Sequence, residues 1–325
     1  MAPELADPFP RSTSMRLARL AAISLTALAT GFIAGCANST ASRPASATTS
    51  TPAADPVIEP EAFAAALAAA DDRRIILDCR KLEDFAPAHI AGSRRVDLAD
   101  WSKLSRSQGG LDDAAAWSDR IGALGISDSS RVFVLDAGGM TDAARVWFLL
   151  QRFGVRDVRV VNGGWKNLQP LLADTALQRG TSSAVVPASF TARVQSSAVG
   201  VTSRDDLKSS AAKKSAAVLD VRTIDEYPGK SAKEGERGGH VPTATNLPHR
   251  DMLDDSGRLR PTPELREMLG AKTLQTDEDV VVFCESGGRA SLAALAAVRA
   301  GYTNVTNYYM SMGDWLGDES CPIQK

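Results

Sequence analysis

One short stretch of the chain carries residue types that could perform nucleophilic chemistry: Val281-Val282-Phe283-Cys284-Glu285-Ser286-Gly287-Gly288-Arg289-Ala290. Its apolar half predicts a buried strand that ends at Cys284, and its glycines predict a turn into a helix. A thiol in this place lies among backbone N–H groups at the positive end of a helix, which favours thiolate over thiol. We therefore predict that Cys284 is a nucleophile.

The residues after the cysteine could hold an anion. Gly287 and Gly288 allow successive backbone N–H groups to converge above the sulfur, and Arg289 adds a full positive charge. These features would also stabilise an extra sulfur carried on Cys284 as a persulfide anion. They favour this interpretation over the alternative that Cys284 is an inert core residue at the end of a strand.

Two other cysteine reactions fit the sequence less well. A papain-like hydrolase needs a histidine base, and His249 is available, but no residue that would orient it is evident. A cysteine phosphatase wraps a longer loop around a tetrahedral phosphate, and the four residues between Cys284 and Arg289 are one too few for that loop. The short loop favours the enclosure of a single sulfur atom.

The elements around this loop indicate a parallel α/β sheet. Short apolar runs at 75–77, 131–135 and 158–161 alternate with segments of helical pattern at 57–70, 117–124 and 142–153. In such a sheet the carboxyl ends of the strands meet at one edge. That edge is where Cys284 is expected to lie.

The same order of motifs returns roughly 145 residues further along the chain. The matching segments are Leu77-Asp78-Cys79-Arg80 with Leu219-Asp220-Val221-Arg222, His89-Ile90-Ala91 with His240-Val241-Pro242, and Phe133-Val134-Leu135-Asp136 with Val281-Val282-Phe283-Cys284. We predict two copies of one domain, at 57–175 and 201–325. Residues 176–200, rich in Ser, Thr, Ala and Val, are predicted to link them.

Comparison of the copies separates scaffold from chemistry. Features present in both copies are expected to serve the fold, for example as buried ion pairs that fix the loops. The residues that occur at equivalent places in the two copies are Asp78 and Asp220, Arg80 and Arg222, and His89 and His240. Asp136 stands where the second copy has Cys284, and Thr141 stands where it has Arg289. The first copy is therefore predicted to be catalytically silent and to wall off the pocket of the second.

The N-terminal residues predict export. Arg16 and Arg19 precede an apolar run at 20–34, and Ile33-Ala34-Gly35-Cys36 resembles a bacterial lipoprotein box. Residues 1–36 are accordingly predicted to be a signal peptide that ends in an acylated Cys36, with Met15 as a possible start. The apolar run is short for a transmembrane helix. Residues 37–56 lack large apolar side chains and are predicted to tether the folded domains to a membrane.

Length and composition permit two domains and exclude several kinds of site. The chain has 325 residues, 44% of them hydrophobic, and a formal net charge of −2. This balance gives no support for nucleic-acid binding. We expect no metal, because the spacing that a zinc site requires is missing among His89, His240, His249, Cys36, Cys79, Cys284 and Cys321.

Three motifs of the second copy resemble those of the rhodanese family of sulfurtransferases, specifically the tandem-domain thiosulfate and 3-mercaptopyruvate sulfurtransferases. They are Leu219-Asp220-Val221-Arg222 with Asp225-Glu226-Tyr227-Pro228-Gly229, Gly239-His240-Val241-Pro242 with Asn246-Leu247-Pro248, and the loop from Val281 to Arg289. The resemblance spans about Val57 to Ile323. It implies two tandem rhodanese-like α/β domains, each a mostly parallel sheet flanked by helices, with an inactive first repeat.

The resemblance also implies sulfur transfer in two steps without a cofactor. Cys284 would take a sulfane sulfur from a small anionic donor, thiosulfate or 3-mercaptopyruvate, and the Cys284 persulfide would then pass it to cyanide or a thiol acceptor. The backbone from Glu285 to Arg289 would hold the persulfide, and Arg289, the second catalytic residue, would help to bind the anionic donor. The expected substrate-binding residues are Glu285, Ser286, Gly287, Gly288, Arg222 and Arg250.

The loop departs from the family pattern after the cysteine. Thiosulfate enzymes of this type place basic residues there and mercaptopyruvate enzymes a glycine-serine-glycine-valine-threonine run, whereas this chain has Glu285. A carboxylate at this position repels a dianion and disfavours thiosulfate. A persulfide carrier without turnover and, less well supported, a cysteine phosphatase stay open as alternatives, and Cys321 could resolve an oxidised Cys284 as a disulfide.

Overall fold

The computed structural model describes residues 55–194, 197–272 and 276–325. The predicted signal peptide at 1–36, Cys36 and all but the last two residues of the predicted tether at 37–56 lie outside the described residues. Within the described ranges, no helix combines the length and the apolar character that crossing a membrane requires.

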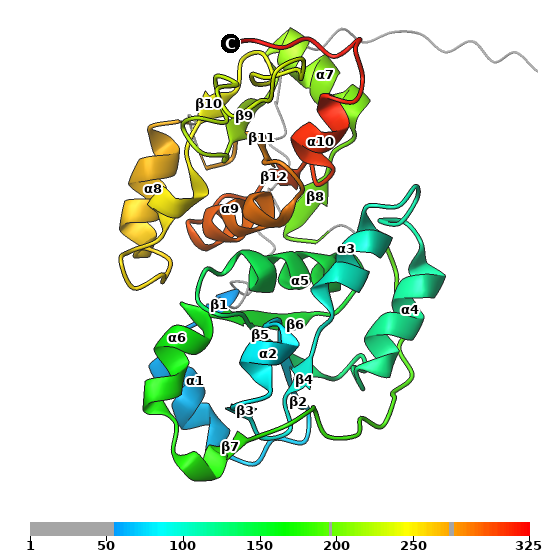
Figure 1. Cartoon of the computed structure of the whole chain (residues 1–325), viewed down its shortest axis with the longest axis vertical. Helices are drawn as coiled ribbons and strands as arrows, with labels where there is room; N and C mark the ends of the chain where they lie inside the picture. Colours follow the sequence, from blue (N-terminus) through cyan, green and yellow to red (C-terminus); the bar gives the residue numbers. More distant parts are fainter. Residues whose placement is uncertain (1–54, 195–196, 273–275) are drawn as a thin grey trace, which may run out of the picture. The chain divides into compact units, whose positions relative to one another are not determined.

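The first copy is an alternation of strands and helices (Figure 1). Its elements are β1 (Val57–Ile58), α1 (Pro60–Leu67), β2 (Arg74–Asp78), α2 (Leu82–Phe85), β3 (His89–Ile90), β4 (Arg94–Arg95), α3 (Leu98–Ser105), α4 (Ala114–Ala123), β5 (Arg131–Leu135), α5 (Thr141–Arg152), β6 (Asp157–Val161), α6 (Gly164–Leu168), η1 (Gln169–Leu171), η2 (Asp174–Ala176) and β7 (Leu177–Gln178).

The second copy repeats this plan. Its elements are β8 (Val199–Val201), α7 (Arg204–Lys213), β9 (Ala217–Asp220), β10 (Thr245–Asn246), η3 (His249–Met252), α8 (Thr262–Gly270), β11 (Val280–Phe283), α9 (Gly288–Arg299), β12 (Val305–Asn307) and α10 (Ser311–Trp315).

The two large sheets have the same strand order. The first runs β1-β6-β5-β2-β4 and the second β8-β12-β11-β9-β10, and every pairing in both is parallel. The central strands β5 and β11 are apolar and almost entirely buried, as strands covered by helices on both faces must be. The prediction of an α/β fold with two parallel sheets flanked by helices is confirmed.

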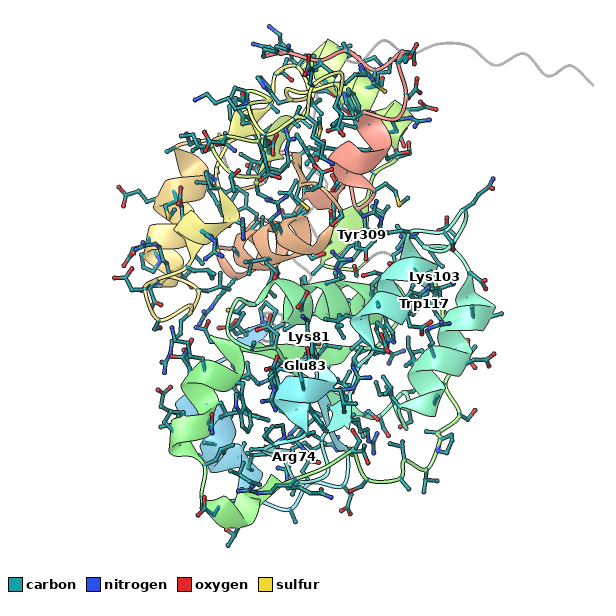
Figure 2. All side chains as sticks on the ribbon, in the orientation of Figure 1. Arg74, Lys81, Glu83, Lys103, Trp117 and Tyr309 are labelled. Atoms are coloured by element: carbon teal, nitrogen blue, oxygen red, sulfur yellow. The ribbon has the colours of Figure 1, made fainter. Side chains whose placement is uncertain are left out.

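The two copies pack against each other through α5 and α9. Tyr309, which follows β12 and is labelled in Figure 2, stacks on Phe148 of α5 with ring centroids 5.4 Å apart. Its hydroxyl also forms a hydrogen bond of 2.8 Å with the hydroxyl of Ser105 at the end of α3. The first copy therefore supports the segment around Tyr309 in the second copy.

Much of the predicted linker at 176–200 lies along the first copy. The short strand β7 pairs antiparallel with β3, and the Ala188 N–H donates to the Gly122 carbonyl at 3.0 Å. The Phe190 side chain is buried in the main hydrophobic cluster. The chain then enters β8, the edge strand of the second sheet.

A buried ion pair closes the end of an inner strand in each copy. Arg80 binds Asp78 at 2.7 Å and Arg222 binds Asp220 at 2.6 Å, and all four side chains are nearly inaccessible to solvent. Each arginine also donates to a carbonyl further along the chain, that of Ala88 or Gly239. The expectation that these paired residues serve the scaffold is confirmed.

The two copies also share a stacked histidine ring beside each ion pair. His89 stacks on Phe85 with ring centroids 3.8 Å apart, and His240 stacks on Tyr227 at 3.6 Å. In both cases the histidine Nδ1 lies within hydrogen-bonding distance of its partner's backbone carbonyl. His240 is therefore a structural residue, as its occurrence in both copies predicts.

Replacing Arg222 with Met should lower the free energy of unfolding by about 3–5 kcal/mol, because the buried Asp220 carboxylate loses its counter-charge. Urea denaturation followed by circular dichroism measures the change. Arg80→Met in the silent copy is the matched control and should show a loss of similar size. A loss below about 1 kcal/mol for Arg222→Met would mean that the pair acts like an exposed salt bridge.

Candidate active site

Cys284, the predicted nucleophile, lies where β11 ends. The Cys284 side chain is only 1% exposed, because β11 runs through the centre of the sheet and α9 covers the loop. The Ser311 hydroxyl accepts a hydrogen bond from the Cys284 N–H at 3.1 Å, and the Met312 N–H donates to the Cys284 carbonyl at 3.1 Å. The backbone of the cysteine is thus fixed by the start of α10.

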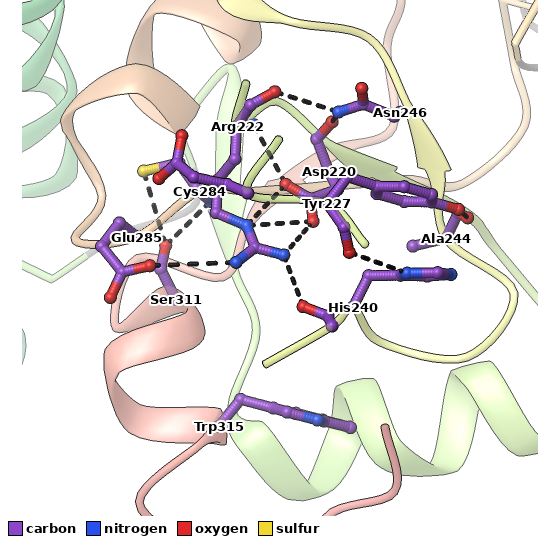
Figure 3. A network of polar contacts seen from close by, with 12 residues as sticks. Asp220, Arg222, Tyr227, His240, Ala244, Asn246, Cys284, Glu285, Ser311 and Trp315 are labelled. Atoms are coloured by element: carbon purple, nitrogen blue, oxygen red, sulfur yellow. Dashed lines mark hydrogen bonds and ion pairs between the residues drawn. The ribbon is translucent and has the colours of Figure 1, made fainter. Parts of the chain in front are cut away.

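One backbone donor approaches the sulfur itself, because the Gly287 N–H lies 3.1 Å from the Cys284 Sγ. The Ser311 hydroxyl lies beside the sulfur (Figure 3), at 3.8 Å, and donates to the Tyr308 carbonyl at 2.9 Å. Gly287 has φ of +91°, and a Cβ there would fall 2.6 Å from the Tyr309 carbonyl oxygen. Only glycine can present its N–H to the sulfur in this way.

In the first copy, the carboxylate of Asp136 fills the loop that is equivalent to the Cys284 loop. One oxygen of the Asp136 carboxylate accepts hydrogen bonds from the N–H groups of Gly138 and Met140, at 2.9 and 3.1 Å. The other accepts from Asp142 and Ala143, at 3.2 and 3.3 Å. Burial raises the pKa of Asp136, and these hydrogen bonds oppose that effect. The loop is a ring of N–H groups that its own side chain occupies.

In the second copy, the equivalent ring of N–H groups has fewer hydrogen-bond acceptors. Cys284 stands in the place of Asp136 and receives one backbone hydrogen bond, from Gly287. Among the described residues, the backbone N–H groups of Ser286 and Gly288 donate to no protein acceptor. These groups belong to the loop and to the first residue of α9, where unpaired donors favour an anion.

The cation of the loop is held by an acid that the sequence analysis did not single out as functional. Arg289 makes two hydrogen bonds to the Glu226 carboxylate, of 2.6 and 2.8 Å. Burial would raise the pKa of Glu226, but its bonds to Arg289 and Thr223 outweigh this and lower the pKa to about 2. The pair with Glu226, and then the charge of Cys284, raise the pKa of Arg289, so both side chains of the pair are charged.

Glu285 lies at the rim of the site. Its side chain is half exposed and its carboxylate approaches the Arg222 guanidinium at 4.0 Å, as Figure 3 shows. Burial raises the pKa of Glu285, and the charge of Arg222 opposes the shift. Arg222 itself is committed to Asp220 and the Gly239 carbonyl, so it borders the site mainly as part of the scaffold.

His249 is placed near Arg289 but is a poor base. Burial, together with the charge of Arg289, lowers the pKa of His249 to about 4, and its Nδ1 is buried without a partner in the described part of the chain. The neutral imidazole is thus a weak acceptor for a thiol proton. Arg250, the next residue, is exposed, and its charge contributes to the lowered pKa of His249.

The other cysteines of the described residues are free and buried. Burial raises the pKa of the Cys79 thiol, which ends β2 in the silent copy, and it also raises the pKa of Cys321. In both cases the charge of nearby aspartates adds to the effect of burial, so both are held as thiols. The possibility that Cys321 resolves an oxidised Cys284 stays a prediction.

A cavity of about 380 Å³ lies beside the loop. Its lining residues include Arg222, Glu226, Glu236, Arg237, Glu285 and Leu316, and the glycine-rich segment 229–239 forms one wall. Arg237 donates to three backbone carbonyls, those of Leu316, Asp318 and Cys321. The cavity therefore brings together carboxylates and arginines that are already hydrogen-bonded within the protein.

Two residues important to the site were missed from the sequence. Ser311 lies 27 residues beyond Cys284 and reaches it only because β12 returns beside β11, with Ser311 at φ of +59°. Glu226 lies 63 residues before Arg289. An acidic residue occurs at this position in both copies, as Asp84 and Glu226, so the comparison of copies gave no signal for it.

The comparisons with known proteins agree with this geometry. The Rhodanese-like domain model matches residues 59–170 and 203–318. A thiosulfate sulfurtransferase of Pseudomonas aeruginosa is 29% identical over 272 residues, which cover 82% of this chain and 96% of that protein. Thiosulfate sulfurtransferase of Gallus gallus is 28% identical over 72% of this chain and 80% of its own. Human 3-mercaptopyruvate sulfurtransferase is 27% identical over 71% of this chain and 78% of its own.

Solved structures with the same fold include SseA of Escherichia coli, described as a 3-mercaptopyruvate sulfotransferase. Its TM-score is 0.68 at 22% identity, with 79% of this chain and 99% of that chain covered. An anaerobic ergothioneine biosynthesis enzyme of Chlorobium limicola has a TM-score of 0.72 at 18% identity, with coverage of 83% and 70%. With two family domains, a cysteine at the loop of the second and sulfurtransferases among its relatives, the chain belongs to the rhodanese family.

Proposed function

We propose that the protein is a sulfurtransferase that moves a sulfane sulfur from thiosulfate or 3-mercaptopyruvate to cyanide or a thiol acceptor through a Cys284 persulfide. The relatives named thiosulfate sulfurtransferase and 3-mercaptopyruvate sulfurtransferase support this class of reaction. Neither donor is favoured by identity, because relatives of both kinds are about equally distant.

One observation supports the proposal most directly. In the silent copy the loop surrounds the two oxygens of Asp136 with four N–H groups. Cys284 is shorter and leaves the Ser286 and Gly288 N–H groups without an acceptor in the described protein. An added sulfur on Cys284 would carry its negative charge into this ring, where it would take the hydrogen bonds that the Asp136 carboxylate takes in the other copy.

The proposed reaction follows from this arrangement. The Cys284 thiolate attacks the terminal sulfur of the donor, a new S–S bond forms, and the old bond to that sulfur breaks with its electron pair on the leaving group. From thiosulfate the leaving group is sulfite. The acceptor then attacks the outer sulfur of the persulfide, and Cys284 returns as thiolate.

Incubation with either donor should add the mass of one sulfur atom to Cys284, and cyanide should then release thiocyanate over many turnovers. Cys284→Ser should abolish both, because its hydroxyl is not ionised and cannot carry a sulfane sulfur. Intact mass spectrometry and a thiocyanate assay provide the measurements. Cys79→Ala is the matched control, since it removes a buried cysteine at the end of a strand in the silent copy.

The outcomes separate the competing functions. Normal turnover in Cys284→Ser would refute the proposal. A single sulfur on Cys284 without repeated turnover would instead support a persulfide carrier. Cys284-dependent hydrolysis of phosphate esters would support a phosphatase.

Sulfur transfer should show no dependence on the protonation of His249 between about pH 5 and about pH 8. Its pKa of about 4 lies below this range, so the imidazole is neutral throughout and becomes charged only as the pH falls towards 4. The profile of kcat/KM for the donor should have the same shape in wild type and His249→Asn. An inflection near pH 6.5 that vanishes in the variant would indicate a cysteine–histidine hydrolase pair.

We also propose that the protein is exported and anchored through an acylated Cys36. The proposal rests on Arg16, Arg19, the apolar run at 20–34 and the small residues before Cys36. In a bacterial host, the full chain should incorporate labelled palmitate and sediment with membranes, and Cys36→Ala should lose the label. Equal labelling of wild type and Cys36→Ala would contradict acylation at this residue.

A further inference from the structure

We propose that Glu226 determines which sulfur donors the site accepts, by holding Arg289 so that donors with one negative charge are preferred to dianions. The inference rests on the proposed function, because it concerns the donor half of sulfur transfer at Cys284. It adds a specificity-determining residue from outside the catalytic loop.

The first step concerns the pairing of Arg289 with Glu226. Its two terminal nitrogens both point to the Glu226 carboxylate, at 2.6 and 2.8 Å, and both side chains are about one-fifth exposed. A two-pronged pair of this kind fixes the guanidinium plane. Its positive charge is therefore compensated by a carboxylate before any donor arrives.

The second step concerns the partners of the other arginines around the site. Arg222 is bound to Asp220 and the Gly239 carbonyl, and Arg237 is bound to backbone carbonyls. On the side of the first copy, Arg145 donates to the Ser102 hydroxyl at 2.6 Å and lies over the Tyr309 ring. Arg106 lies near Gly313, and Arg250 is exposed beside His249. Among the described contacts, these last two and Arg145 have no carboxylate or carbonyl partner.

The third step concerns the further carboxylates that line the cavity. Glu285 stands at the rim with only a 4.0 Å approach to Arg222, and Glu236 lines the same cavity with a 3.2 Å hydrogen bond from the Lys233 N–H. His249 adds no positive charge near neutral pH. Because Glu226 pairs with Arg289 and Asp220 with Arg222, neither arginine brings an uncompensated positive charge to the sulfur, and Glu285 adds a carboxylate at the rim.

The Glu226 carboxylate discriminates by donor charge, because a dianion meets twice the Coulomb repulsion from Glu226 that a monoanion meets at the same place. Two donors isolate this effect. Thiosulfate carries two charges, and methanethiosulfonate carries one. The same bond forms in both cases, between Cys284 Sγ and the terminal donor sulfur. The donor S–S bond breaks, and its electron pair leaves with sulfite or with methanesulfinate.

The test compares the two donors in wild type and Glu226→Gln. Glutamine keeps an oxygen for one hydrogen bond from Arg289 but removes the charge. The ratio of kcat/KM for thiosulfate to kcat/KM for methanethiosulfonate should rise on the order of tenfold. In a two-step exchange this quantity reports the donor step alone, and the ratio cancels any loss of folded enzyme. Glu264→Gln is the matched control, because it neutralises an exposed glutamate that pairs with Arg260 and does not line the cavity, and it should leave the ratio within about twofold of wild type.

Each outcome bears on the inference. An unchanged ratio in Glu226→Gln, with persulfide still forming on Cys284, would overturn the role of Glu226 and leave the proposed function intact. A shift in Arg106→Gln alone would assign donor selection to the first copy and would also overturn it. Failure of wild type to form a persulfide with either donor would instead refute the proposed function.

Discussion

The site depends on one constraint: the loop between β11 and α9 must point several backbone N–H groups at a single buried position. A buried donor without an acceptor costs about 1–3 kcal/mol. The silent copy removes that cost by placing the Asp136 carboxylate among its donors. The second copy has Cys284 instead and leaves donors of Ser286 and Gly288 unmatched in the described protein. A persulfide sulfur on Cys284 would accept the hydrogen bonds that the cysteine alone leaves unmade.

The rest of the second domain keeps this loop in place. The Asp220–Arg222 pair closes the neighbouring strand β9, and α10 fixes the Cys284 backbone through Ser311 and Met312. Tyr309 lies against Gly287 on one side and against Phe148 of the silent copy on the other. The first copy thus supports the back of the loop in the second.

The sequence was sufficient for the architecture and for the place of Cys284 at the end of a buried central strand. Repetition of strand-end motifs predicts two equal sheets, and the Asp–Arg pairs follow from their occurrence in both copies. Contacts between distant segments could not be predicted in the same way. Ser311 reaches the sulfur through the return of β12, and Glu226 meets Arg289 across 63 residues. The loop alone suggests a free cation, whereas the fold gives that cation a carboxylate partner.

The most direct test of this account is a crystal structure of the protein after exposure to a sulfur donor. It should show one added sulfur on the Cys284 Sγ, directed into the loop and within hydrogen-bonding distance of the backbone N–H groups of Ser286 and Gly288. An added sulfur that points out of the ring towards the cavity, with those N–H groups still unmatched, would contradict it.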